Sequence, residues 1–256
     1  MFNGKVFLAE FIGTFALTFI GIAAGVIGGA SNSLGISVLV TALAGGFVLA
    51  VMIYTYGEVS GAHVNPAVTF GLALNGTIKW GQAAFYWIAQ FVGAILAGFA
   101  LSYTLQALGG TIDGGATTGV LTNAASATTQ TYVMAMVMEA ILTFFLVNTF
   151  LHSSKIGSLG GLAVGATYAF GILAGGAFTG GSFNPARTFG ALLPLAVSKA
   201  DFSAFATPFT YVVYLFGPLV GATIAVLAFN YFQGITEEEI VEIEEVEVVE
   251  IDEAAS

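Results

Sequence analysis

The tripeptide Asn-Pro-Ala occurs twice in this chain, in SGAHVNPAVTFG at residues 60–71 and in GGSFNPARTFG at residues 180–190. Asparagine is a favoured N-cap and proline a favoured first helical residue, so we predict short helices from Pro66 toward Leu74 and from Pro185 onward. A helix that begins inside a membrane directs unpaired backbone N–H groups and the positive end of its dipole into the protein. Two such helix starts facing each other predict the centre of a pore.

The composition is that of a membrane protein. Of the 256 residues, 57% are hydrophobic and 8% are charged, which leaves too little polar surface to cover a soluble domain. Ten of the fifteen acidic residues lie between Glu237 and Glu253, so the net charge of −10 belongs to the C-terminal tail. The sequence has no basic cluster that would bind nucleic acid. With no cysteine and two histidines, neither a metal site nor a cofactor is expected.

Apolar windows of about 20 residues, the length that crosses a bilayer, predict six transmembrane helices. The first window is too long for the core of a signal peptide and contains Glu10. The windows fall near residues 6–28, 36–56, 82–107, 132–151, 158–178 and 208–232. One Asn-Pro-Ala segment follows the second window and the other follows the fifth, and each is about half as long as a span. This arrangement predicts two re-entrant half-helices.

The two halves of the chain also match outside the tripeptides. AEFIGTFALTF, which begins at Ala9, is similar to MEAILTFFLV, which begins at Met138. FVGAILAGF, from Phe91, is similar to LVGATIAVLAF, from Leu219. Because the repeated unit has an odd number of spans, the second copy must enter the membrane from the opposite side. The expected fold is an inverted three-span repeat with its functional site near the midplane.

The expected domain boundaries follow from this repeat. We predict one channel domain over residues 1–232, with repeat one at about 5–107 and repeat two at about 131–232. Residues 107–131 are expected to form an external loop between the repeats. Residues 233–256 are a block of like charge, which predicts an acidic, disordered tail.

The lysines indicate an orientation. If the N-terminus is inside, then Lys5, Lys79 and Lys155 lie on the cytoplasmic side and only Lys199 lies outside. This distribution agrees with the excess of positive charge on cytoplasmic loops. We therefore expect a multi-pass protein of the plasma membrane with both termini in the cytoplasm.

The six spans, the two half-helices and the paired motifs SGAHVNPAVT and GGSFNPARTFG together resemble the aquaporin and glycerol-facilitator family. The resemblance extends from about Ala9 to Phe232 and suits a prokaryotic-looking member of the family. It implies an all-α membrane protein with the aquaporin-like fold. It also implies a passive channel that conducts water or small uncharged solutes and excludes protons and ions, with no enzymatic activity. A homotetramer in the lipid bilayer, with one pore in each protomer, is implied as well.

The two tripeptides, Asn65-Pro66-Ala67 and Asn184-Pro185-Ala186, supply polar groups for such a pore. A narrow apolar tube needs donors that replace part of the hydration of a passing molecule, and the asparagine NH₂ groups are such donors. Their oxygens would cap the two half-helices, which fixes the amides with their donors facing the lumen. A water that accepts from both asparagines cannot easily accept a proton, and the positive helix ends oppose cations.

Arg187 is the only arginine, and an arginine inside a membrane is costly and marks a functional site. In the resembled family, the matching arginine belongs to the narrowest constriction. The four constriction positions align here with Gly45, Ile172, Gly181 and Arg187. Water-selective members have an aromatic residue and histidine at the first two positions, and glycerol facilitators have tryptophan and phenylalanine at the first and third. This chain is thus expected to have a wide, atypical selectivity filter, unless a register shift brings Gly46 or Phe47 into place.

Two intramembrane acids occupy corresponding places in the first and fourth spans, Glu10 and Glu139. In the resembled family, the matching glutamates accept hydrogen bonds from the backbone of the re-entrant loops, and we favour this structural role. His63 likewise resembles an anchor of the loop rather than a metal ligand. Acids in membranes also form proton relays, so a proton-coupled secondary transporter that uses Glu10 and Glu139 stays an alternative.

Two further alternatives remain. The small filter residues favour a facilitator for glycerol, metalloid acids or ammonia that has little selectivity for water. A membrane structural or adhesion protein with a vestigial pore would share the same repeat. It is disfavoured because the two asparagines and the arginine are all present.

Overall fold

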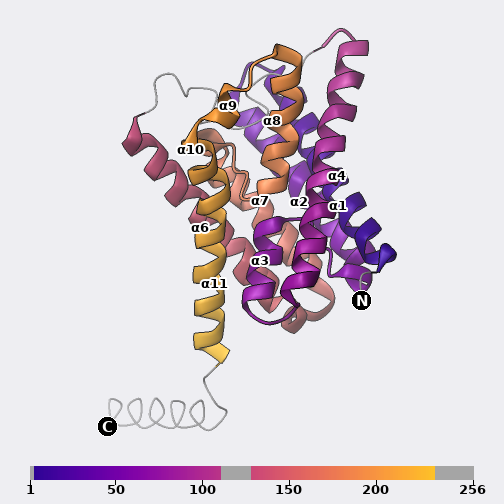
Figure 1. The fold of residues 1–256 in the computed structure, drawn as a ribbon, viewed down its shortest axis with the longest axis vertical. Helices are drawn as coiled ribbons and strands as arrows, with labels where there is room; N and C mark the ends of the chain where they lie inside the picture. Colours follow the sequence, from indigo (N-terminus) through magenta and orange to yellow (C-terminus); the bar gives the residue numbers. More distant parts are fainter. Residues whose placement is uncertain (1–2, 111–127, 234–256) are drawn as a thin grey trace, which may run out of the picture.

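The computed structural model describes residues 3–110 and 128–233, and these residues form helices joined by loops (Figure 1). Five apolar stretches are long enough to cross a membrane, and one of them, Thr129–Thr179, contains two successive helices. Six crossings result, as the sequence predicts. They are α1 (Gly4–Gly29), α2 (Leu34–Ser60), α4 (Trp80–Ala107), α6 (Thr129–Ile156), α7 (Gly160–Thr179) and a composite segment of α10 (Pro208–Tyr211), η4 (Val212–Phe216) and α11 (Gly217–Gln233).

The two half-helices begin at the predicted prolines. The first, α3 (Pro66–Leu74), has 9 residues and the second, α8 (Pro185–Lys199), has 15, so α8 is longer than the sequence pattern indicates. Each half-helix has an asparagine as its N-cap. The side-chain oxygen of Asn65 accepts from the Ala67 backbone N–H at 2.8 Å, and that of Asn184 accepts from the Arg187 backbone N–H at 3.1 Å. The short elements η3 (Gly157–Leu159) and α9 (Ser203–Ala206) connect longer helices.

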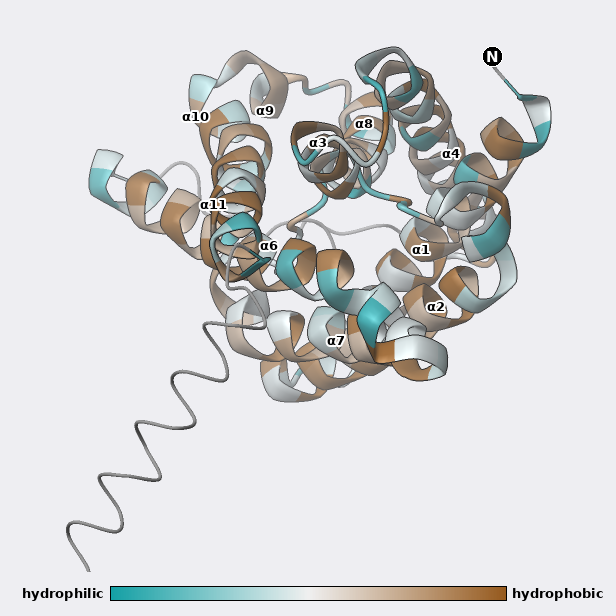
Figure 2. Ribbon diagram, turned by 90° about the horizontal axis from the view of Figure 1, so that it is seen from below, coloured by the Kyte–Doolittle hydropathy of each residue, from teal (hydrophilic) through white to brown (hydrophobic). Residues whose placement is uncertain are grey.

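The half-helices lie between α4 and α11. In Figure 1, α3 occupies the lower half of the molecule and α8 the upper half, and seen from below both lie between α11 on the left and α4 on the right (Figure 2). Each half-helix packs against the last long helix of the other repeat, α3 against α11 and α8 against α4. Because each half-helix packs against the other repeat, the two repeats are joined. The N-caps of the half-helices, Asn65 and Asn184, lie close together at the middle of the protein.

Close helix crossings depend on glycines that match between the repeats. A β-carbon on Gly93 would lie 2.5 Å from the Phe11 carbonyl oxygen, and one on Gly221 would lie 2.1 Å from that of Ala140. These crossings pack α1 against α4 and α6 against α11. Where the repeats meet, Gly46 of α2 lies against the backbone of α7 in the same way. Small residues at these places let the backbones approach as membrane helices often do.

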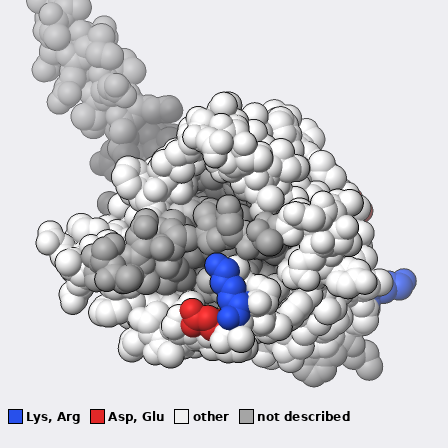
Figure 3. Space-filling model, turned by 90° about the horizontal axis from the view of Figure 1, so that it is seen from above, with Lys and Arg blue, Asp and Glu red and all other residues white. Residues whose placement is uncertain are grey.

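The outer surface of the helices is apolar, which suits contact with lipid. Large apolar side chains such as Ile27, Leu43 and Leu227 are exposed. Figure 3 looks down on one end of the molecule, where a few charged side chains are visible. Most of the predicted external loop at 107–131 and all but the first residue of the predicted acidic tail at 233–256 lie outside the described residues.

Candidate functional site

The loops that lead into the half-helices share an unusual backbone conformation. Three residues in each loop have positive φ, in corresponding order: Gly61, Ala62 and Val64 in the first, and Gly180, Gly181 and Phe183 in the second. Residues other than glycine rarely adopt this left-handed conformation, so the surrounding structure must hold it. In both loops, a buried glutamate from another helix does so.

Glu10 of α1 accepts hydrogen bonds from the first loop through both carboxylate oxygens. One oxygen accepts from the Ser60 hydroxyl at 2.7 Å and the His63 backbone N–H at 2.9 Å. The other accepts from the Val64 backbone N–H and the Gln90 amide, both at 2.8 Å. The carboxylate is fully buried, and both oxygens accept from the loop and its neighbours, as a structural role requires.

Glu139 of α6 does the same for the second loop. It accepts from the Thr179 hydroxyl at 2.6 Å, from the Ser182 backbone N–H at 3.1 Å and from the Phe183 backbone N–H. Like Glu10, it is fully buried. The two carboxylates therefore occupy equivalent places in the inverted repeat, and each fixes one loop next to its asparagine.

His63 lies at the predicted anchoring position in the first loop. Its Nδ1 is 3.1 Å from the Thr69 hydroxyl of α3, and its ring packs against Tyr86 and Phe150. In the second loop, Ser182 takes the place of His63 and bonds Thr188 of α8. A side chain therefore links each loop to the half-helix that follows it.

Sequence reasoning missed a pair of tyrosines that also support the loops. Tyr86 of α4 donates a hydrogen bond to the Ser60 carbonyl at 2.7 Å, and Tyr214 donates to the Thr179 carbonyl at 2.8 Å. The signal was present in the repeat, because each tyrosine stands seven residues before a matched glycine, Gly93 or Gly221. Extending the comparison of the halves by two turns would have found both.

The two asparagines reach across to one another's loops. The Asn65 amide nitrogen donates to the Phe183 carbonyl oxygen at 2.8 Å, and the Asn184 amide nitrogen donates to the Val64 carbonyl oxygen at 2.9 Å. An amide NH₂ has two hydrogens, and the cross-bond uses one of them. The sequence predicts that the donors face the lumen, but one hydrogen of each amide instead ties the repeats together.

Arg187 lies in the first turn of α8 and is only 2% exposed. Its Nε and Nη1 have no hydrogen-bond partner among the described residues. Buried polar groups are nearly always paired, and two unpaired nitrogens on a buried guanidinium are costly. Its Nε also lies 3.8 Å from the place a β-carbon on Gly21 of α1 would take.

The structure brings the three other predicted filter residues together. A β-carbon on Gly45 would lie 3.3 Å from Ile172 Cδ1, and one on Gly181 would lie 3.1 Å from Ile172 Cα. The register alternatives do not fit, because Phe47 is 62% exposed on the outer surface and Gly46 is buried against α7. Open space at Gly45 was expected from the sequence, but the ring of Tyr168 lies there, with its Cε1 2.7 Å from the added β-carbon.

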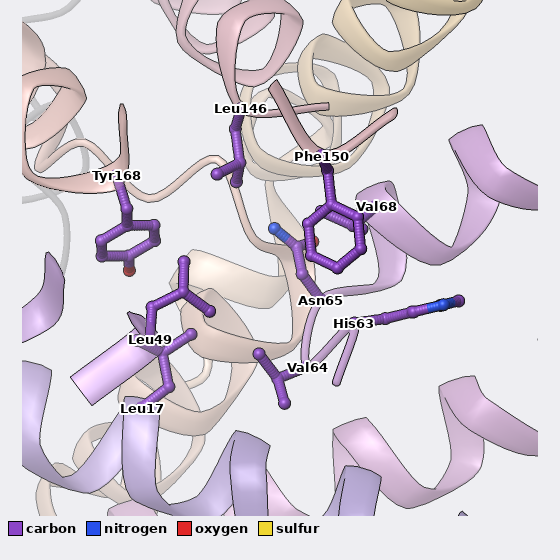
Figure 4. Close-up of a pocket in the computed structure, with 9 residues that line it drawn as sticks. All are labelled: Leu17, Leu49, His63, Val64, Asn65, Val68, Leu146, Phe150 and Tyr168. Carbon is purple, nitrogen blue, oxygen red and sulfur yellow. The ribbon is translucent and has the colours of Figure 1, made fainter. Parts of the chain in front are cut away.

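A pocket beside Asn65 extends between the two repeats (Figure 4). Its walls are mostly apolar, and the few polar groups come from Asn65, His63 and Tyr168. The amide nitrogen of Asn65 points toward the middle of the group of side chains. The pocket is lined by Leu17, Leu49, His63, Val64, Asn65, Val68, Leu146, Phe150 and Tyr168.

Comparison with known protein families agrees with the resemblance seen in the sequence. The family model described as "Major intrinsic protein" matches residues 2–229. The chain belongs to the major intrinsic protein family. Among its relatives, aquaporin TIP2-1 of Arabidopsis thaliana is 38% identical over 246 residues, covering 91% of this chain and 89% of that protein. Aquaporin NIP2-3 of Zea mays is 36% identical over 234 residues, covering 90% of this chain and 70% of that protein.

A solved structure shares the fold of this major intrinsic protein. The X-ray structure of the aquaglyceroporin from Plasmodium falciparum superposes with a TM-score of 0.69 at 22% identity, covering 87% of this chain and 93% of the other. The aquaporin fold predicted from the sequence is thus confirmed. As a member of this family, the protein is a multi-pass membrane protein and a passive channel for water and small solutes, and it is not an enzyme.

Proposed function

We propose that the pore passes water and small uncharged solutes between Asn65 and Asn184 and excludes protons and cations. The observation that carries the proposal is the pair of capped, cross-bonded amides. Each amide keeps one hydrogen that is not used in its cross-bond, so two fixed donors remain for a passing molecule. A molecule that accepts both hydrogen bonds is held with its lone pairs occupied, which interrupts a proton relay.

The charge barrier is assigned to Arg187 and to the N-termini of α3 and α8. Two nitrogens of the guanidinium lack partners among the described residues, so they are free to donate to a solute. The fixed positive charge repels cations, and the dipoles of the half-helices add partial positive charge at the motifs. Gly45, Ile172 and Gly181 are proposed as the other three filter residues.

A structural role for Glu10 and Glu139 is preferred over proton coupling. Both carboxylates accept hydrogen bonds from backbone N–H groups of strained loops. Protonation of either acid would remove acceptor sites that the loop needs, and this cost opposes a transport cycle. Membership of a family of passive channels argues in the same direction.

Water is the preferred permeant, and the Tyr168 ring at Gly45 supports a narrow pore. The relatives named aquaporins, at 36–38% identity, support it as well. Glycerol, metalloid acids and ammonia are the solutes of the alternative proposal, which rests on the two filter glycines.

The orientation, the membrane and the assembly are proposed as follows. Lys79 precedes α4, and Lys155 lies in the last turn of α6 and bonds Gln233 at the end of α11. These lysines mark the end of the molecule drawn lowest in Figure 1. The excess of lysine favours a cytoplasmic location for this end and for both termini, in a plasma membrane. Residues 1–232 are proposed as the channel domain, and family membership supports a homotetramer in lipid.

The test is stopped-flow light scattering on proteoliposomes that contain the purified protein. Osmotic water flux is compared with the fluxes of glycerol, urea and ammonia, with empty liposomes as the control. The proposal predicts water flux well above that of empty liposomes. Glycerol or ammonia flux without faster water flux would instead support the facilitator alternative.

A further inference from the structure

Gly45 has no side chain, and the volume that one would occupy is filled by a residue of a different helix. Gly45 belongs to α2, and the ring of Tyr168 belongs to α7. A β-carbon placed on Gly45 would meet Tyr168 Cε1 at 2.7 Å and Cδ1 at 3.3 Å. The first distance is shorter than van der Waals contact allows. The Tyr168 ring and a side chain at Gly45 therefore compete for the same volume.

The position of the ring is fixed by the packing around it. Tyr168 is 1% exposed, and its ring packs against Phe183 with centroids 4.6 Å apart and planes at 61°. Phe183 is the residue whose carbonyl accepts the Asn65 cross-bond. The adjacent residue of α2, Gly46, crosses α7 at Gly165, where an added β-carbon would lie 2.6 Å from the Gly165 carbonyl oxygen. This close crossing gives the ring no room to move outward between the helices.

The ring also lies where solute would pass. Tyr168 shares the pocket beside Asn65 with Leu17 and Leu49, and in Figure 4 its hydroxyl points toward Leu49. One turn farther along α7 is the proposed filter residue Ile172, which also contacts the space above Gly45. The ring therefore lies at the Gly45 position of the proposed filter and also lines the pocket beside Asn65.

We infer that Tyr168 is a specificity-determining residue of this pore and that its ring replaces the filter side chain absent at Gly45. The width of the pore between α2 and α7 is thus set from α7, so the two glycines in the filter do not make the pore wide. This inference rests on the proposed channel function. It adds that solutes larger than water are excluded by the phenol ring.

The competition for one volume makes a specific prediction about pairs of substitutions. A large side chain is accommodated at residue 45 or at residue 168, but not at both. In the protein with Tyr168→Val, the space opens and glycerol should pass more readily. In the double variant with Gly45→Phe added, a ring returns to the same volume from α2 and should restore the exclusion.

The experiment measures the ratio of glycerol to water permeability in proteoliposomes by stopped-flow light scattering. We expect Tyr168→Val to raise this ratio about tenfold, the lower end of the discrimination that a change in pocket shape gives. Tyr168→Phe keeps the ring and should keep the wild-type ratio. Phe170→Ala, two residues away and 48% exposed on the outer surface, is the matched control on α7 and should also leave the ratio unchanged.

The outcomes separate this inference from the proposed function. Wild-type liposomes with no water flux above background would contradict the channel function itself. Normal water flux with an unchanged ratio in Tyr168→Val would overturn the inference and leave the channel intact. If Tyr168→Val does not elute as a folded protein in size-exclusion chromatography, Tyr168→Leu takes its place. Leucine keeps an apolar contact with Phe183 but lacks the part of the ring that lies near Gly45. An unchanged ratio in that variant would overturn the inference equally.

Discussion

The side-chain amide of Asn65 donates a hydrogen bond to the backbone carbonyl of Phe183, over 2.8 Å and across the boundary between the two repeats. In the equivalent hydrogen bond of the other repeat, the side-chain amide of Asn184 donates to the backbone carbonyl of Val64. Each asparagine therefore does three things with one side chain. Its oxygen caps a half-helix, one N–H ties the other loop, and the remaining N–H is available to a molecule in the pore.

The Asn65→Asp substitution tests the amide donors separately from the helix cap, because it removes the donors and keeps the capping oxygen. Aspartate keeps the oxygen that accepts from Ala67, so the start of α3 is preserved. It loses the hydrogen bond to Phe183 and places negative charge where cations should be excluded. We expect a loss of at least about 1–3 kcal/mol in stability, because the buried Phe183 carbonyl loses its donor and faces a carboxylate oxygen. Proton entry into proteoliposomes should be faster.

The matched control is Asn3→Asp, which changes an exposed N-cap at the start of α1. It should alter neither thermal unfolding in detergent nor proton flux. Equal proton flux in wild type and Asn65→Asp would count against the role of the amide donors.

Glu139→Gln tests the support of the second loop. The substitution replaces one acceptor oxygen by an NH₂ donor, which then faces a donor from Thr179, Ser182 or Phe183. Each buried donor left without an acceptor costs about 1–3 kcal/mol, so the thermal midpoint should fall by several degrees. Glu58→Gln changes an exposed glutamate of α2 and should leave the midpoint unchanged. A stable Glu139→Gln protein with normal flux would show that the carboxylate is dispensable.

Arg187→Val removes the only guanidinium from the pore. Because its Nε and Nη1 have no partners among the described residues, its loss breaks no protein hydrogen bond from those atoms. We expect the fold and the water flux to persist while protons and small cations enter more rapidly, since the charge barrier is removed. Lys199→Val, at the exposed end of α8, is the control for loss of a positive charge. Ion-tight vesicles with Arg187→Val would refute the assigned barrier.

Gly165→Ala tests the helix crossing that holds Tyr168 in place. The added β-carbon would lie 2.4 Å from the Gly46 carbonyl oxygen, so α2 and α7 must separate. Overpacking of this kind costs about 1–3 kcal/mol, which a thermal unfolding series detects. Gly81→Ala, at a glycine of α4 with open space around it, should be neutral or slightly stabilising. A Gly165→Ala protein as stable as Gly81→Ala would mean that the crossing is looser than described.

Much of this architecture is readable from the sequence because it depends on local chemistry and on the repeat. Apolar length predicts the spans, and Asn-Pro predicts the starts of α3 and α8, since capping is a short-range interaction. The comparison of halves aligned Glu10 with Glu139, and both hold equivalent loops. These features need no knowledge of how distant helices pack.

The shape of the pore was not predictable in the same way. Gly45 predicts a gap only if nothing else enters it, and whether Tyr168 enters depends on how closely α2 and α7 cross. A single filter position therefore does not give the width of the lumen. The cross-bonds of Asn65 and Asn184 were missed for a similar reason, because their acceptors are backbone carbonyls that sequence does not distinguish.

The most direct test of the central claim is osmotic water flux and proton flux measured on the same proteoliposomes, over a range of temperatures. A pore lined by fixed amide donors predicts rapid water flux with a low activation energy, the same rate with and without a pH gradient, and no proton flux above that of empty vesicles. Water or solute flux that saturates and follows the proton gradient would contradict the account, because it would identify a coupled transporter.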